Sequence, residues 1–440
     1  MKQFSRILLI DTTLHKCSAT GITLSNLFGG WPKDLLFMVG DQLSVKLSIE
    51  AGYRGTYQLN ANDYYHKFPL GLVLLLYRTL SGWGRKMFLN VELNSNRTDK
   101  SSQIELNRFS TKNYFQSLFQ YLGLDHLLFR QVISKELRQW INTHNPDYFY
   151  AVLSSRHSIL FARNLVSEFR KPIVVHIMDD WPTTIGSNSL FYRYWNRKIN
   201  DELNSLIKIS YKRIAISELM AIEFSKRFSA NWSYYHNPVD TSFWRPITKR
   251  KLHDSSSFTI LYSGRLSTGI NETIKLVSAA VDDINHTTDF KVTFRIQSGM
   301  APSWIDSFKS TIFSKSIDYD LLPNLFSSVD LLLLPYDFFG QSFEFIRLSM
   351  PSKLTEYMAS GTPILIVAPS NTALSDYALK SNFGHVVNSN NTRHIKENIL
   401  FLLENVNLLA HYSKRSLRLV NDSFEISKVQ KSFQELFFIV

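Results

Sequence analysis

Two short apolar segments, far apart in the chain, restrict what this sequence can fold into. Residues 6–13 (RILLIDTT) and 258–266 (FTILYSGRL) lack the 3.6-residue period of a helix. Each is followed by a loop rich in small residues and then by a helical pattern. This order is typical of the first strand and helix of a doubly wound parallel sheet. The sequence therefore predicts two successive α/β domains.

The first domain is expected over residues 1–245. Further strands are predicted at 34–40, 148–153 and 173–178, and a helix is predicted at 132–145, ending before Pro146. The strand and helix rhythm fails between 53 and 112, which we interpret as an insertion. Its apolar part, residues 68–80, has basic residues around it. This part either packs into a core, which is the commoner outcome, or lies on a membrane surface.

The second domain is expected over residues 257–425. Its predicted strands are 258–263, 291–296, 330–334 and 362–367, and its predicted helices are 272–282, 322–327 and 353–360. Helical patterns follow at 395–408, 411–420 and 426–437. The last stretch, residues 426–440, is expected to cross back to the first domain.

Charge and cysteine content limit the partners and the compartment. Lys and Arg number 49 against 37 Asp and Glu, so the formal net charge is +12, which attracts nucleotides, other anions and acidic lipid headgroups. The basic residues are scattered, which argues against nucleic acid as a partner. One cysteine, Cys17, allows no intramolecular disulfide. The N-terminal apolar run is too short for a signal peptide, so we expect a cytoplasmic protein, at the inner face of an anionic membrane.

The segment 349–369 (SMPSKLTEYMASGTPILIVAP) is the most informative motif. It reads as a loop opening onto a helix near Ser352, closed by Gly361 before a buried strand. Free N–H groups at a helix start, with Lys353 beside them, suit a phosphate anion. Glu356 follows one turn later, where a carboxylate can accept hydrogen bonds from two ribose hydroxyls or serve only as a first-turn helix charge.

This segment resembles the donor-site signature of GT-B glycosyltransferases, especially family four. Residues 262–266 (YSGRL), 322–335 and 214–240 resemble further parts of that family in the same order. The resemblance implies two Rossmann-like domains facing each other across a cleft. The donor-binding residues it implies are Gly21, Gly264, Arg265, Ser349, Ser352, Lys353, Leu354 and Glu356.

The sequence departs from the family pattern in two places. The first of the family's two glutamates would stand at position 348, which is Leu348, and the lysine that usually follows the arginine is missing. These departures keep open a non-catalytic subunit that binds a sugar nucleotide or a partner enzyme. A sugar-nucleotide epimerase shares the architecture, but its glutamate and histidine pattern is not evident.

The end of the predicted strand 173–178 carries the densest group of titratable residues. His176, Asp179 and Asp180 are therefore the candidates for general-base or sugar-contacting roles. The plainer alternatives are a core histidine and a helix-capping aspartate.

The leading hypothesis is a glycosyltransferase. It would move a sugar from a nucleoside-diphosphate sugar to a hydroxyl of a glycan or lipid-linked acceptor, in surface polysaccharide synthesis. The resemblance implies retention of the anomeric configuration and neither metal nor cofactor, because basic side chains and a helix start take the charge of the departing diphosphate.

Overall fold

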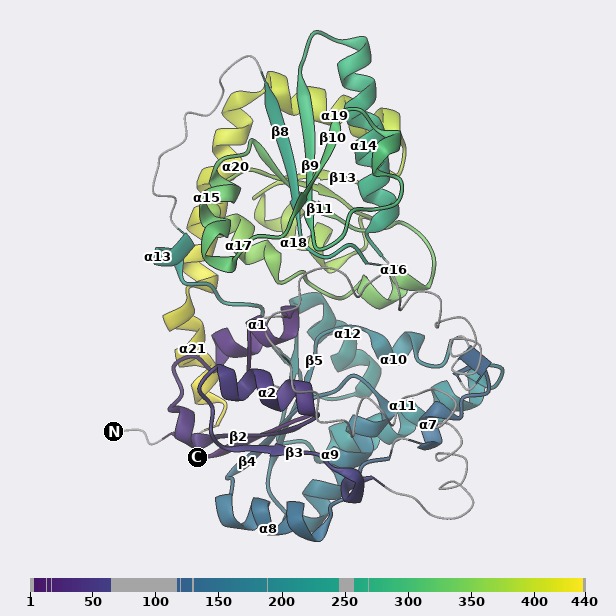
Figure 1. The fold of residues 1–440 in the computed structure, drawn as a ribbon, viewed down its shortest axis with the longest axis vertical. Helices are drawn as coiled ribbons and strands as arrows, with labels where there is room; N and C mark the ends of the chain where they lie inside the picture. Colours follow the sequence, from purple (N-terminus) through teal and green to yellow (C-terminus); the bar gives the residue numbers. More distant parts are fainter. Residues whose placement is uncertain are drawn as a thin grey trace, which may run out of the picture. The chain divides into compact units, whose positions relative to one another are not determined.

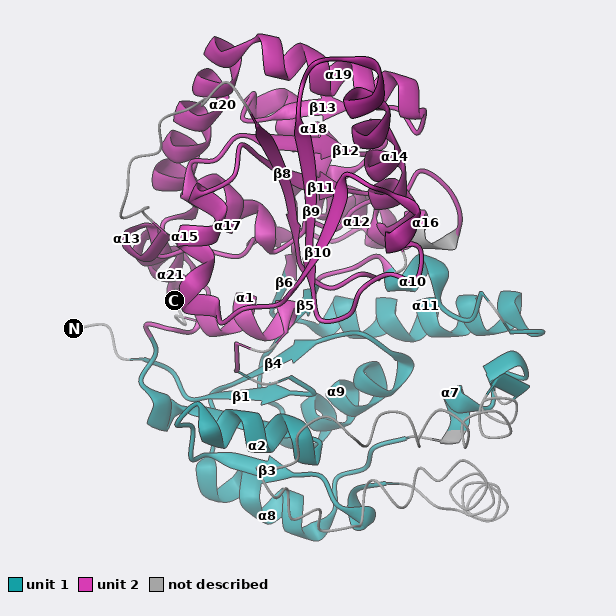
Figure 2. Ribbon diagram, turned by 45° about the horizontal axis from the view of Figure 1, so that its top comes forward, with its two compact units in different colours: residues 1–14, 31–177, 181–213 teal, residues 15–30, 178–180, 214–440 magenta. Residues whose placement is uncertain are grey.

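The computed structural model describes residues 4–12, 14–16, 18–64, 117–118, 120–128, 130–187, 189–244, 257–267 and 269–437. The chain divides into two compact units, coloured separately in Figure 2. Unit 1 comprises residues 1–14, 31–177 and 181–213, and unit 2 comprises residues 15–30, 178–180 and 214–440. Two short segments from the first half of the sequence thus belong to unit 2.

The first sheet has seven strands in the order β3-β2-β1-β4-β5-β6-β7 (Figure 1). The strands are β1 (Ile7–Ile10), β2 (Leu36–Gly40), β3 (Thr56–Gln58), β4 (Tyr148–Val152), β5 (Ile173–Ile177), β6 (Lys212–Ala215) and β7 (Ser233–Tyr234). Strand β1 pairs in parallel with both β2 and β4, and β2 pairs in parallel with β3. The central strands are buried along their whole length, which explains why they read as continuous apolar runs.

The helices that accompany the first sheet are interspersed with its strands. They are α1 (Ala19–Leu27), α2 (Gln42–Glu50), α7 (Asp125–Leu128), α8 (Lys135–His144), α9 (Arg156–Phe169), α10 (Trp181–Thr184), α11 (Tyr192–Ile209), α12 (Glu218–Phe228) and α13 (Thr241–Trp244).

The second sheet has six strands in the order β10-β9-β8-β11-β12-β13, all paired in parallel. The strands are β8 (Phe258–Ser263), β9 (Val292–Ser298), β10 (Thr311–Lys315), β11 (Leu331–Pro335), β12 (Ile364–Val367) and β13 (His385–Val387). Its helices are α14 (Asn271–Thr287), α15 (Leu322–Ser327), α16 (Gln341–Ile346), α17 (Lys353–Ser360), α18 (Ala373–Ser381), α19 (Thr392–Glu404), α20 (Val406–Leu419) and α21 (Ile426–Glu435), with a π-helical turn at Val420–Phe424.

Helices cover both faces of the second sheet. Ile260 and Tyr262 of β8 pack into one apolar cluster with α14, α19 and α20, whereas Leu261 between them packs into a second cluster with α15, α17 and α18. This alternation follows from the two-residue period of a strand. The sheet is therefore the middle layer of three, and the α/β class predicted from the sequence is confirmed.

The sequence predictions differ from the structure in several places. The strand predicted at 34–40 begins at Leu36 in the structure, two residues later than expected, because Lys33–Leu35 forms a 3₁₀ turn. The expected insertion was also placed too early, because Thr56–Gln58 forms β3 beside β2. Residues 65–112 of that stretch, including 68–80, lie outside the described residues, as do residues 248–256 between the two expected domains and Cys17.

The end of the described chain packs against a helix from its beginning. The ring centroids of Phe433 in α21 and Phe28, which follows α1, lie 5.0 Å apart, and Gln430 Nε2 donates to the carbonyl of Asn26 at 2.7 Å. These residues all belong to unit 2. Across the described residues, no helix has both the length and the apolar character needed to cross a membrane.

Candidate functional site

The candidate site is built where the carboxyl end of β8 meets the start of α17. The Tyr357 hydroxyl accepts a hydrogen bond from the Ser263 N–H at 3.0 Å and donates to the Ser263 carbonyl at 3.3 Å, which ties α17 to the strand end. Lys353, one turn earlier on α17, then lies directly over Gly264. A Cβ atom built on Gly264 would stand 1.6 Å from Lys353 Nζ, and its φ is +150°. The positive φ favours glycine here, and any side chain would displace the flexible end of this lysine.

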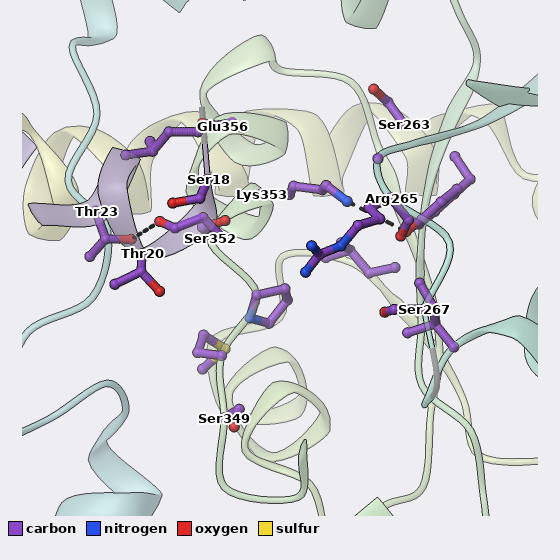
Figure 3. A pocket seen from close by; sticks show the side chains of 18 of the residues that line it. Ser18, Thr20, Thr23, Ser263, Arg265, Ser267, Ser349, Ser352, Lys353 and Glu356 are labelled. Atoms are coloured by element: carbon purple, nitrogen blue, oxygen red, sulfur yellow. Dashed lines mark hydrogen bonds between the residues drawn. The ribbon is translucent and has the colours of Figure 1, made fainter. Parts of the chain in front are cut away.

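Two cations extend into one cavity of about 540 Å³ (Figure 3). Lys353 Nζ lies 4.9 Å from the ring centroid of Tyr262 and 3.5 Å from its hydroxyl. The pKa of Lys353 is lowered to about 8: burial lowers it most, Glu356 opposes this, and the positive charge of Arg265 adds to the lowering. An anion between the two cations would offset this repulsion.

Glu356 is the acidic group of the same cavity wall. Its side chain is only 4% exposed, and Tyr319 donates a hydrogen bond to its Oε1 at 3.1 Å. Burial raises the pKa of Glu356 to about 7, although the Tyr319 hydrogen bond and Lys353 both lower it. The pKa of this carboxyl is thus close to neutral pH. Among the described residues only Tyr319 donates a hydrogen bond to it, so it can accept further hydrogen bonds from a ligand.

Helix α1 brings hydroxyl groups to the same cavity, which Ser18 and Thr20 line (Figure 3). The side chain of Asn237 connects α1 to the loop before α17: its Oδ1 accepts from Asn26 at 3.0 Å, and its Nδ2 donates to the Ser352 carbonyl at 3.1 Å. This explains why the segment 236–240 (HNPVD) belongs to the site although it contributes no lining residue.

Of the three candidate residues at the end of β5, only one lines the cavity. Asp179 lines the cavity, and the Ser349 hydroxyl donates to its Oδ1 at 2.8 Å, while burial raises its pKa. His176 does not line it: the side chain is fully buried in unit 1, with Nδ1 2.6 Å from the Tyr150 hydroxyl. Asp180 is also outside the lining, because its two oxygens pair with Arg227 at 2.7 and 2.9 Å.

The other predicted donor-site residues divide in the same way. Those that line the cavity are Gly264, Arg265, Ser349, Ser352, Lys353 and Glu356. Gly21 and Leu354 are not lining residues. A Cβ at Gly21 would lie 2.4 Å from the His15 carbonyl oxygen, so this glycine serves the chain's own turn, and Leu354 is buried in the core. Leu348 is buried as well, and Ser217 donates to its carbonyl.

Known proteins match this chain in structure rather than in sequence. No protein-family model and no curated protein matches the sequence. The structure is similar to Anabaena HepE in complex with UDP and glucose (13% identity, 98% of each chain, TM-score 0.60) and to sucrose-phosphate synthase from Thermosynechococcus elongatus (12%, 98% of each chain, 0.62). It is also similar to α,α-trehalose 6-phosphate synthase from Burkholderia multivorans (11%, 99% of this chain and 98% of that one, 0.58). The chain has the GT-B fold.

The GT-B cavity contains residues that the sequence did not single out. Lys16 lies 5.5 Å from the centroid of the Tyr319 ring. Gln297, at the end of β9, accepts from the Ser263 hydroxyl at 2.7 Å, and its Nε2 has no hydrogen-bond partner among the described residues. Only the pairing of β8 with β9 brings Gln297 here, so no local motif could have shown it.

Among the described residues, no three His, Cys, Asp or Glu side chains gather in a group that could hold a metal ion.

Proposed function

We propose that this protein transfers a sugar from a nucleoside-diphosphate sugar to a hydroxyl group of a glycan or lipid-linked acceptor. The observation that carries the proposal is the convergence of Arg265 and Lys353 in one cavity with the buried Glu356. Two close cations select an anion, and a carboxylate beside them selects a neighbouring hydroxyl donor. A nucleoside diphosphate has both groups, in its diphosphate and its ribose.

The proposed chemistry is the stabilisation of a leaving group. The bond between the sugar's anomeric carbon and the diphosphate oxygen breaks, and negative charge develops on that oxygen. Arg265 offers a planar set of N–H donors, and Lys353 and the start of α17 add positive charge. In this proposal these groups take the charge without a metal ion or a cofactor.

The acceptor half of the reaction requires a proton acceptor. The acceptor oxygen forms the new bond to the anomeric carbon, and its proton passes to a base in the cavity or to the departing diphosphate. Asp179 is the proposed base, because it lines the cavity and burial raises its pKa. His176 and Asp180 remain untested predictions for this role. The family-four resemblance supports retention of the anomeric configuration.

We further propose that the acceptor belongs to surface polysaccharide synthesis at the cytoplasmic face of an anionic membrane. The formal net charge of +12 supports this location.

A nucleotide screen tests the donor site. The thermal midpoint of the protein is measured with UDP, GDP, ADP, CMP and TDP, because a ligand that binds only the folded state raises it. UDP is the first choice, since HepE was solved with UDP and glucose. We expect one nucleotide to raise the midpoint, Arg265→Ala and Glu356→Ala to abolish the rise, and Arg418→Ala, at an exposed arginine, to keep it. A midpoint unchanged by all five would overturn the donor site.

A transfer assay then separates the enzyme from a binding subunit. The nucleoside-diphosphate sugar of the responding nucleotide is incubated with the protein, and release of the free nucleotide is followed. Binding without hydrolysis or transfer would favour a non-catalytic sugar-nucleotide-binding subunit. The buried Leu348, at the position of the family's first glutamate, is the observation that keeps this second candidate.

A further inference from the structure

The start of α11 in unit 1 carries a group of apolar side chains that face water. Leu190, Phe191 and Tyr194 are 57%, 52% and 58% exposed, and Tyr192 between them is 38% exposed. Arg193 and Arg197 are exposed on the same two turns. We call these six residues the aromatic-basic patch. Exposed apolar residues are normal singly, but four within five positions mark an interaction surface.

The backbone under the aromatic-basic patch is held in place. The Leu190 N–H donates to the Tyr121 carbonyl at 2.6 Å, and the Trp195 N–H donates to the Phe191 carbonyl at 3.0 Å. Trp195 itself is buried, and a Cβ on Gly123 would lie 2.2 Å from its Nε1. The segment before α7 and the start of α11 therefore pack closely. The exposed side chains project from a well-packed base.

The chemistry of the aromatic-basic patch indicates its partner. No acidic residue occurs between positions 181 and 200. The first ones after the patch are Asp201, one turn beyond Arg197, and Glu202, which pairs with Arg156, so the two arginines of the patch still leave it with a net positive charge. Side chains more than half exposed project from the surface instead of lining a groove. Projecting aromatic and aliphatic groups with arginines beside them suit the headgroup layer of a bilayer, which has an apolar boundary and, where anionic lipids are present, negative charge.

We propose that the aromatic-basic patch binds the surface of an anionic lipid bilayer. Phe191, Tyr194 and Leu190 would enter the headgroup boundary, and Arg193 and Arg197 would contact lipid phosphates. Sugar transfer is not needed for this contact, so vesicle binding and nucleotide binding can fail independently.

Vesicle sedimentation with the full chain tests the proposal. The vesicles contain phosphatidylcholine alone or phosphatidylcholine mixed with phosphatidylglycerol. We expect the protein to sediment with the mixed vesicles and to be released by salt. The double variant Phe191→Ser and Tyr194→Ser should bind the mixed vesicles at least about tenfold more weakly, because it loses the apolar contact. Arg193→Gln and Arg197→Gln should each weaken binding about fivefold.

Ile209→Ser is the matched control, because Ile209 is 53% exposed at the other end of the same helix. It should sediment like the unaltered protein. Each variant is also checked for an unchanged thermal midpoint, so that loss of binding cannot come from unfolding. The proposal is overturned if the unaltered protein stays in the supernatant with mixed vesicles, or if the double aromatic variant sediments as well as the protein itself. Equal binding to both vesicle types would overturn the anionic part.

Discussion

Unit 2 contains two groups of charged side chains that are removed from water in different ways. Asp180, 1% exposed, has both carboxylate oxygens paired with the guanidinium of Arg227. In the cavity, Glu356 accepts one hydrogen bond from Tyr319, and the hydrogen bond of Lys353 to Tyr262 is a long one of 3.5 Å. The charges of the first group pair with each other, whereas the second group can still donate and accept hydrogen bonds to a ligand.

This difference separates a structural pair from a binding site. A buried charge with all its partners can hold elements together, but it has nothing left for a ligand. Burial with incomplete partners disfavours the charged form of a side chain in the free protein, and this shifts its pKa. We therefore expect changes to the Asp180 pair to alter stability and changes to the cavity group to alter binding.

Removing Asp180 should have the largest effect. Asp180→Ala leaves Arg227 without its main partner, and we expect the free energy of unfolding to fall by about 3 kcal/mol, as for other broken buried pairs. Chemical denaturation measures this. Glu223→Ala is the control, because Glu223 is 40% exposed and 3.8 Å from the same arginine, and it should change little. Unaltered stability with abolished sugar transfer would instead give Asp180 a catalytic role.

Sequence patterns could predict local elements of the cavity wall well. The limits of β8, α15 and α17 agree with those expected from the sequence. For α17 the reason is local, since Gly361 ends the helix with a φ of +72° that favours glycine. Such signals lie within a few residues of the boundary that they mark.

Partners far apart in sequence could not be predicted in this way. Asp180 and Arg227 are separated by 47 positions, and Tyr319 and Glu356 by 37. The sequence placed Asp180 beside Asp179 as an equal candidate, but only the folded chain shows that one is paired and the other lines the cavity. The edge strand β10 was also missed, because its partly exposed residues lack a continuous apolar run.

Removing either cavity cation should weaken nucleotide binding strongly without destabilising the fold. Each of Lys353→Ala and Arg265→Ala is expected to reduce affinity for the responding nucleoside diphosphate by about 2 kcal/mol, or roughly thirtyfold, because a charge-assisted phosphate contact is lost. Calorimetric titration measures the dissociation constant. Lys309→Ala, at an exposed lysine of the same unit, should bind like the unaltered protein. Equal affinity in all three variants would contradict the comparison.

The cavity group should also give stability a particular pH dependence. The pKa of Glu356 rises from 4.5 to about 7 on folding, so the folded state binds more protons than the unfolded state between these values, and stability falls as pH rises through this window. The pKa of Lys353 falls from 10.5 to about 8, so stability rises with pH between 8 and 10.5. These two groups destabilise the free protein most near pH 7 to 8, where both are charged.

Glu356→Gln isolates the acidic part of this profile. Between pH 4.5 and 7 the free energy of unfolding of the unaltered protein should fall by about 2 kcal/mol through Glu356, and this fall should be absent in the variant. Denaturant unfolding at several pH values measures both profiles. Glu344→Gln, at a half-exposed carboxylate, is the control and should change the slope much less. Parallel profiles for the protein and Glu356→Gln would mean that Glu356 titrates normally and is not held in the cavity as described.

The smallest expected effect tests how the cation is positioned. Gly264→Ala places a methyl group where Lys353 Nζ lies, 1.6 Å from the new Cβ, so the flexible lysine must move while its charge is kept. We expect nucleotide affinity to fall about tenfold, less than on removing the lysine, because a displaced cation still attracts the diphosphate. Gly299→Ala is the control for adding a methyl group, since its Cβ would meet no atom within 4 Å. The thermal midpoint of Gly264→Ala is measured as well, because its φ of +150° makes alanine strain the backbone there. If Gly264→Ala binds the nucleotide as tightly as Gly299→Ala, then the position of Lys353 is unimportant and its charge alone contributes to affinity. If Gly264→Ala binds as weakly as Lys353→Ala, then the charge contributes to affinity only when α17 lies close to β8.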